Sequence, residues 1–278
     1  MNIQDYKSGF HIGMHGLGMV YGIPHSNSQE ALEYWKAKGI NFFEVDIAIT
    51  DDDEYILLAH DVNRKDLKKI EVLEKPIDGK YTIEWINNIR SCKLSSKIGF
   101  RIITLEEFIR IVASDSRMIA MVDTYGRNEN DIINIVSIIE KNVGNNPEVM
   151  DRVLVETYSL DDSRKILSLF QHVHIIACIR EDGYKFWTND INLELLGGID
   201  FISCKWKYIR EEKKIIEFCK ANNIGILSLS RFDNNRRKKI RMGVNINLVD
   251  VYGNSNVLIY CKNMFDYLLH FLRIMKEQ

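Results

Sequence analysis

Residues 40–49 read Ile-Asn-Phe-Phe-Glu-Val-Asp-Ile-Ala-Ile, an apolar run that carries two carboxylates two positions apart. Its length and its aromatic and β-branched residues are typical of a buried strand. Because side chains alternate along a strand, Glu44 and Asp46 lie on one face and Val45 on the other. The stretch therefore predicts a buried strand that presents both carboxylates to the same side.

Similar short apolar runs recur along the chain, and most are followed by a segment with apolar residues at helical spacing. This alternation is typical of strand-helix units that build a parallel sheet. The expected strands are Phe10–Met14, Phe42–Ile49, Met118–Val122, Val153–Thr157, Val173–Ile179, Phe201–Ser203, Gly225–Leu229 and Ile246–Val249. The expected helices are Ser28–Lys38, Glu107–Ala113, Asn130–Lys141, Asp161–Phe170, Arg210–Asn222 and Phe265–Lys276.

Two of these helices begin with capping signals. Asn27 precedes the first helix and is its N-cap candidate, and Thr104 with Glu107 matches a capping box. Local sequence thus supports the helix assignments at these two places.

The repeat of units favours an α/β fold, a closed (β/α)8 TIM barrel, over an open doubly wound sheet. Eight units close a ring, and no glycine fingerprint follows the first strand. At 278 residues the chain fits one barrel, so we predict a single domain over residues 1–278. The lysine- and glutamate-rich stretch 61–103 lacks the alternation and is interpreted as an insertion after the second strand.

Composition excludes several classes of protein. A formal net charge of -2 gives no electrostatic basis for nucleic-acid binding. No apolar run is long enough for a membrane span, and the first residues lack the apolar region of a signal peptide. The cysteines stand singly, which favours a reducing compartment, and we expect a cytoplasmic protein; they are Cys92, Cys178, Cys204, Cys219 and Cys261.

A short basic run, 233–241, contains five lysine and arginine residues: Arg236, Arg237, Lys238, Lys239 and Arg241. Such a run attracts acidic partners in some proteins, but it is more often a solvated helix face. We interpret it as the latter.

Two histidines flank the carboxylate pair in the sequence. His15 follows the first strand in the glycine-rich turn 13–18, and His60 closes the short apolar run 55–59. Glu44 and Asp46 could be solvent-facing charges on an edge strand, and a lone histidine at a strand end is usually structural. Two carboxylates in an apolar interior instead need a counter-charge, and a hard divalent cation is the simplest one. Together these residues indicate a metal site with acid-base groups.

This part of the chain resembles the glycerophosphodiester phosphodiesterase family, a group of PLC-like phosphodiesterases. The matching motifs are His15-Gly16, Asn27-Ser28, Glu44-x-Asp46 and His60-Asp61, in the same order and spacing. The resemblance implies a TIM barrel with an insertion after the second strand. It also implies a phosphoric diester hydrolase that converts small glycerophosphodiester-like substrates to an alcohol and a phosphomonoester.

The resemblance further implies residue roles. His15 and His60 would be the acid-base pair, and Glu44 and Asp46 would hold a divalent metal, Mg²⁺ or Ca²⁺. A third metal ligand belongs at the end of the next barrel strand, where Asp123 is the candidate. Which histidine is the acid stays open, as does whether water or a substrate hydroxyl is the nucleophile.

Two positions depart from the family pattern. Gly16 stands where many members have arginine, and Tyr125 stands where they have a phosphate-contacting lysine. Substrate-binding candidates are therefore sought at later strand ends: Arg180, Lys205, Glu156 and Tyr158. Lys205 also fits a plain surface segment, and Glu156 also fits a partner of the metal ligands.

Two alternatives follow from the same residues. The departures also fit a barrel that has lost turnover and binds phosphate or a polyol phosphate. Unrelated barrel chemistry, such as metal-dependent sugar isomerisation, would need histidines and carboxylates at later strand ends. His172 and His174 instead lie at a strand start, the side of a barrel linked to stability.

Overall fold

The computed structural model describes residues 2–20, 27–49, 55–57, 101, 103–125, 127–143, 146–170, 172–178, 197–206, 213–230 and 235–249. His60, Arg180, the expected helix at 265–276 and almost all of the insertion 61–103 lie outside these residues. The predictions made for them therefore stay predictions.

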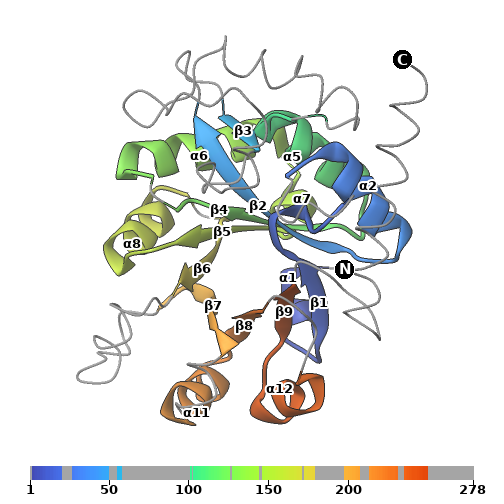
Figure 1. Cartoon of the computed structure of the whole chain (residues 1–278). Helices are drawn as coiled ribbons and strands as arrows, with labels where there is room; N and C mark the ends of the chain where they lie inside the picture. The colour runs from blue at the N-terminus through green and yellow to red at the C-terminus, as the bar shows by residue number, and fades with distance from the viewer. Residues whose placement is uncertain are drawn as a thin grey trace, which may run out of the picture.

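Eight parallel strands close into a barrel, which confirms the predicted fold (Figure 1). Each strand pairs with its neighbour in chain order, and β1 pairs with both the last strand and β2 to complete the ring. Every expected strand overlaps one of the eight. They are β1 His11–Met14, β2 Phe42–Ile49, β4 Ile119–Asp123, β5 Val153–Thr157, β6 His174–Cys178, β7 Ile199–Lys205, β8 Gly225–Leu229 and β9 Ile246–Val249.

A ninth strand, β3 Tyr55–Leu57, stands outside the ring. It pairs antiparallel with the end of β2, with Ile47 opposite Leu57. The chain thus turns back on β2 before the stretch interpreted as an insertion.

Helices surround the barrel on its outer side (Figure 1). They are α2 Gln29–Ala37, α5 Leu105–Ser114, α6 Glu129–Val143, α7 Pro147–Met150, α8 Leu160–Leu169, α11 Lys213–Ala221 and α12 Arg236–Met242. The capping box of α5 is confirmed: the Thr104 N–H donates to Glu107 Oε2 at 3.0 Å, and the Glu107 N–H donates to Thr104 Oγ1 at 3.1 Å. None of the described helices is both long and apolar enough to cross a membrane.

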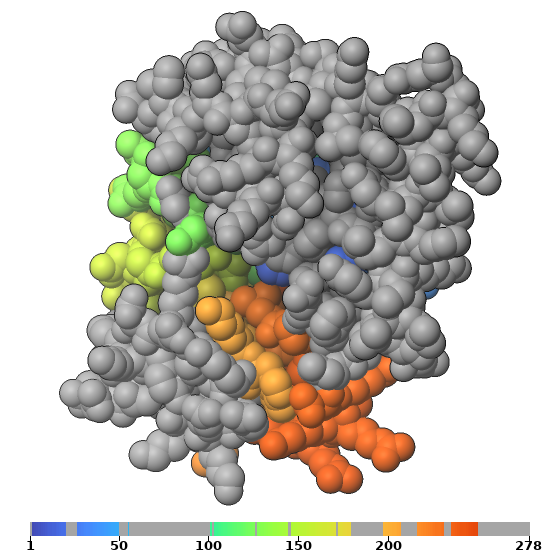
Figure 2. Space-filling model, viewed as in Figure 1, coloured from blue at the N-terminus to red at the C-terminus, as the bar shows by residue number. Residues whose placement is uncertain are grey.

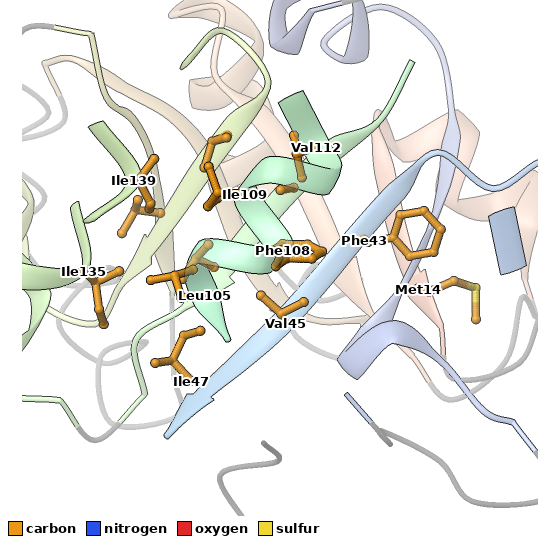
Figure 3. Close-up of a cluster of buried hydrophobic side chains, with 14 of the residues drawn as sticks. Met14, Phe43, Val45, Ile47, Leu105, Phe108, Ile109, Val112, Ile135 and Ile139 are labelled. Atoms are coloured by element: carbon orange, nitrogen blue, oxygen red, sulfur yellow. The ribbon is translucent and has the colours of Figure 1, made fainter. Parts of the chain in front are cut away.

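Strand alternation produces two apolar cores. The outer core lies between the barrel and its helices, and Figure 3 shows Leu105 and Phe108 of α5 beside Val45 and Ile47 of β2. The inner core fills the barrel below its C-terminal end; it consists of Ile3, Tyr6, Phe42, Ile119, Met121, Leu154, Ile176, Phe201, Leu227, Ile246 and Leu248. Because Phe42 belongs to the inner core, Glu44 and Asp46 of the same strand also point inward.

A short helix closes the N-terminal end of the barrel. In α1 Ile3–Tyr6, both Ile3 and Tyr6 are buried against the inner core. Lys7, just after it, forms an ion pair with Asp200 at 3.1 Å. The sequence pattern did not predict this helix, since four residues are too few to display helical periodicity.

Helix α12 forms part of the outer surface (Figure 2) and carries the basic run. Arg236, Arg237, Lys238 and Arg241 are exposed, as expected for a solvated face. Lys239 departs from this prediction because it is fully buried, and its ammonium group donates to Ser230 Oγ and Asn247 Oδ1 at 2.8 Å each. These two acceptors compensate for the loss of water.

Candidate active site

Four acidic side chains meet at the C-terminal ends of β2, β4 and β5, where barrel enzymes place their active sites. The register sets Asp46 opposite Asp123 and Asp123 opposite Glu156. Glu44 lies two residues before Asp46 and therefore points to the same side. All four are buried, with between 1% and 6% of their surface exposed.

Three of these carboxylates can bind one ion together. Glu44, Asp46 and Asp123 each offer an oxygen atom, and these atoms lie within 4.8 Å of one another. Glu44 Oε1 is buried and has no hydrogen-bond partner in the part of the chain that the structure describes. Oxygen ligands of this kind and the unpartnered Glu44 oxygen both fit Mg²⁺ or Ca²⁺.

Electrostatics at Glu44 supports the same interpretation. Burial raises the pKa of Glu44 well above its ordinary value, and the charges of Asp46 and Asp123 raise it further. Three buried anions repel one another unless a cation or protons balance them. A divalent cation at the shared oxygens would remove this repulsion.

The turn after β1 brings His15 to these carboxylates. His15 Nε2 lies 3.9 Å from Glu44 Oε2, and the histidine side chain is 25% exposed. The next residue, Gly16, adopts the left-handed conformation with φ 55°, and its main-chain N–H donates to Glu44 Oε2 at 2.5 Å. Glycine reaches this φ without the steric cost of a Cβ atom. The His15-Gly16 pair therefore places an imidazole ring and a main-chain donor beside Glu44.

Asn27 is not the N-cap of α2, contrary to the prediction. Ser28 caps the helix, since its side chain accepts from the N–H of Ala31 at 3.3 Å. Asn27 is fully buried and hydrogen-bonds to Asp46 instead. The preference for asparagine before a helix drew attention to Asn27, but it could not identify the partner of Asn27, which is Asp46 on the next strand.

Tyr158 connects Asp123 with Glu156. Its hydroxyl oxygen lies 2.7 Å from Asp123 Oδ1 and 3.1 Å from Glu156 Oε2. Ser203 of β7 donates a hydrogen bond to the other oxygen of Glu156. Burial, with the charge of Asp123 next, raises the pKa of Glu156 to about 8. Glu156 and Tyr158 thus lie beside the three-carboxylate cluster, as partners of one of its members.

Tyr125 packs an aromatic ring beside Asp123 and Tyr158. Its main-chain N–H donates to Asp123 Oδ1 at 2.7 Å. Its ring meets the Tyr158 ring edge to face, with centroids 5.4 Å apart. The position therefore supplies packing around Asp123 and no positive charge.

Cations near the rim come from other positions. Lys205 ends β7 with an exposed side chain, two residues after Ser203 and so on the same face of the strand. Arg127 was not among the predicted residues, although it lies in the loop after β4, four residues beyond Asp123. Its Nε atom is buried and lacks an acceptor among the described residues. Its place in a strand-to-helix loop is the signal that could have drawn attention to it.

Comparisons by sequence give no match, either to a protein family model or to a curated protein. Comparison with solved structures gives several proteins of similar fold. The chain is similar to a glycerophosphodiester phosphodiesterase from Thermotoga maritima, with a TM-score of 0.62 and 17% identity over 87% of this chain and 94% of that one. For a glycerophosphodiester phosphodiesterase from Parabacteroides distasonis the TM-score is 0.59, with 14% identity over 94% of this chain and 98% of that one.

A third similar structure is a phosphodiesterase from Oleispira antarctica, in complex with the product sn-glycerol-3-phosphate. Its TM-score is 0.62, with 15% identity over 95% of this chain and 98% of that one. At these identities the three likenesses establish a shared fold over nearly the whole chain.

Proposed function

We propose that this chain is a divergent glycerophosphodiester phosphodiesterase, a metal-dependent phosphoric diester hydrolase. One observation carries the proposal: the buried cluster of Glu44, Asp46 and Asp123 with the His15 ring at 3.9 Å from Glu44. The cluster lies at the end of the barrel where catalytic residues gather. The fold shared with the glycerophosphodiester phosphodiesterases supports the same assignment.

The three carboxylates would hold one Mg²⁺ or Ca²⁺ ion. When bound, such an ion neutralises charge on the phosphoryl oxygens. Gly16 and Tyr158 hold Glu44 and Asp123 by hydrogen bonds, which fixes the direction of their oxygens before a ligand arrives. Pre-oriented ligands lower the cost of assembling the site.

His15 and His60 would share the proton transfers. One takes a proton from the attacking oxygen of water or of a neighbouring substrate hydroxyl, and the other donates a proton to the leaving alkoxide. For His15, the proposal is supported by its partly exposed ring next to the carboxylates. His60 lies outside the described residues, and its assignment follows from the His60-Asp61 motif.

The substrate would be a small glycerophosphodiester. The Oleispira antarctica phosphodiesterase binds sn-glycerol-3-phosphate as its product, and the same kind of product would leave this site. Lys205, Arg127 and Arg180 are the proposed cations for the phosphate, because Tyr125 carries none. Guanidinium groups suit this task, since they bind phosphate in a bidentate manner.

A second function is favoured by Tyr125. The packing of its ring against Tyr158 leaves no cation at the position where the family pattern has lysine. A barrel with this change could bind phosphate or a polyol phosphate without turning it over. Such a protein would still bind the divalent cation but would not hydrolyse the phosphodiester.

Hydrolysis of glycerophosphocholine tests the proposal. The metal-free protein should be inactive, Mg²⁺ or Ca²⁺ should restore activity, and His15→Ala and His60→Ala should abolish it with the fold intact. His172→Ala is the matched control, because His172 is exposed at the opposite end of the barrel. Full activity in both site variants would contradict the proposed mechanism. Tight binding of glycerol phosphate without product over many hours would favour the binding module.

A further inference from the structure

Asn27 is joined to two parts of the site at once. Its side-chain Nδ2 donates to Asp46 Oδ2 at 2.8 Å, and its Oδ1 accepts from the main-chain N–H of Asp46 at 3.0 Å. Its own main-chain N–H donates to the carbonyl oxygen of Gly16 at 3.1 Å. One residue thus links the turn that carries His15 with the strand that carries Asp46.

The orientation of the Asn27 amide follows from its partners. The main-chain nitrogen of Asp46 is a donor, so the oxygen of the amide must face it. The amide nitrogen then faces the carboxylate, where it forms a hydrogen bond to a charged acceptor. With both bonds made, the Asp46 side chain has a fixed direction relative to its own main chain.

The backbone of Asn27 has an uncommon conformation that suits asparagine. Its φ is 47°, in the left-handed region that side chains other than those of Asn and Asp rarely adopt. The residue is also fully buried, with 0% of its surface exposed. Helix capping does not explain the conformation, because Ser28 performs that task.

We propose that Asn27 is a positioning residue that holds Asp46 ready for a divalent cation and ties it to the His15 turn. The inference rests on the proposed function, in which Asp46 is a metal ligand. Asn27 acts through Asp46 and Gly16 and takes no part in the reaction itself. Partners of metal ligands typically change metal affinity by about 10- to 100-fold when they are removed.

Two substitutions separate the side chain from the backbone. Asn27→Gly removes the amide while glycine tolerates the positive φ. Asn27→Asp keeps the acceptor for the Asp46 N–H but loses the donor to Asp46 Oδ2. Ser28→Ala is the matched control, because it removes the cap of the same helix one residue away and leaves the Asp46 contacts in place.

The test measures Ca²⁺ and Mg²⁺ binding by isothermal titration calorimetry on each folded variant. We expect Asn27→Gly and Asn27→Asp to weaken cation binding by about 10-fold or more, with Ser28→Ala within about twofold of wild type. Wild-type affinity in both Asn27 variants overturns the inference but leaves the proposed function standing. Equal weakening in Ser28→Ala also overturns it, since the effect would then come from the helix start. A wild-type protein that binds neither cation overturns the proposed metal site and this inference together.

Discussion

Tyr158 donates its hydroxyl hydrogen to Asp123 Oδ1 at 2.7 Å, across 35 positions of the sequence. The same hydroxyl also lies 3.1 Å from Glu156 Oε2, so two carboxylates share the one hydrogen that a phenol can donate. Burial, with the charge of Asp123 next, raises the pKa of Glu156 to about 8. The Tyr158 hydroxyl thus orients Asp123 and contacts the neighbouring Glu156.

Tyr158→Phe removes the donor to Asp123 and keeps the ring against Tyr125. We expect the metal concentration for half-maximal activity to rise by about 10-fold, because the ligand is less well oriented. Activity should recover at high metal concentration. Hydrolysis rates over a Mg²⁺ or Ca²⁺ series provide the measurement, and an unchanged metal dependence would argue against a role for the hydroxyl.

Stability of the metal-free protein should fall as pH rises from about 4.5 to about 8. Burial, followed by nearby charges, raises the pKa of both Glu44 and Glu156. The folded state therefore binds more protons than the unfolded state in this window, and each rise in pH favours unfolding. Burial alone would lower the pKa of His174, but the contacts with Asp200 and Asp151 outweigh this effect, and the pKa of His174 is raised. The folded protein therefore holds the His174 proton more tightly than the unfolded chain does, and the stability that this contributes is also lost as pH rises.

Melting temperatures at pH 5 and pH 8 check this prediction. Glu156→Gln cannot ionise, so its melting temperature should fall less over the same range than that of wild type. Added Mg²⁺ or Ca²⁺ should raise the melting temperature more at pH 8 than at pH 5, because the cation competes with protons for Glu44. A wild-type melting temperature that rises with pH would contradict the assignment of raised pKa values.

Arg127→Gln should weaken substrate binding. The buried Nε atom of Arg127 lacks an acceptor among the described residues, and a phosphate oxygen would supply one. Loss of one hydrogen bond to a charged group costs about 1.5–3 kcal/mol, so we expect KM for glycerophosphocholine to rise by about 10-fold or more. Arg117→Gln is the control, since Arg117 is exposed and lies before β4 at the other end of the strand. Equal KM values in all three proteins would exclude Arg127 from substrate binding.

Gly225→Ala should destabilise the barrel. Gly225 lies opposite Phe201 in the sheet, and a Cβ atom at Gly225 would overlap the Phe201 ring. Overpacking of this kind costs about 1–3 kcal/mol in the free energy of unfolding. Gly39→Asn serves as the control, because no atom lies within 4 Å of a Cβ at position 39 and asparagine tolerates its positive φ. Urea denaturation curves distinguish the two; equal midpoints would show that Phe201 can move aside at little cost.

Much of the fold could be predicted from the sequence because strands of a parallel barrel are buried on both faces. Continuous apolar runs then mark each strand, and all eight barrel strands overlap expected ones. The short helix α1 could not be predicted, because Ile3 and Tyr6 are buried by residues far along the chain, and the local sequence does not show this. The burial of Lys239 could not be predicted for the same reason, because its hydrogen-bond acceptors, Ser230 and Asn247, lie outside its own helix.

The relative placement of the carboxylates could be predicted where spacing within a strand decides it. Alternation alone placed Glu44 and Asp46 on one face, and the family resemblance suggested Asp123, which the register sets opposite Asp46. The hydrogen-bond partners of these carboxylates were harder to identify, because tertiary contacts determine them. Asn27 was therefore taken for a helix cap, and the direction of Tyr158 toward Asp123 could not be inferred from position.

A crystal structure of the protein with Ca²⁺ and glycerol phosphate tests the central claim most directly. We predict anomalous density for one cation bound by oxygens of Glu44, Asp46 and Asp123, with the phosphate next to it and within reach of His15. Absence of a cation from these three carboxylates at saturating Ca²⁺, or phosphate bound elsewhere on the barrel, would contradict the account.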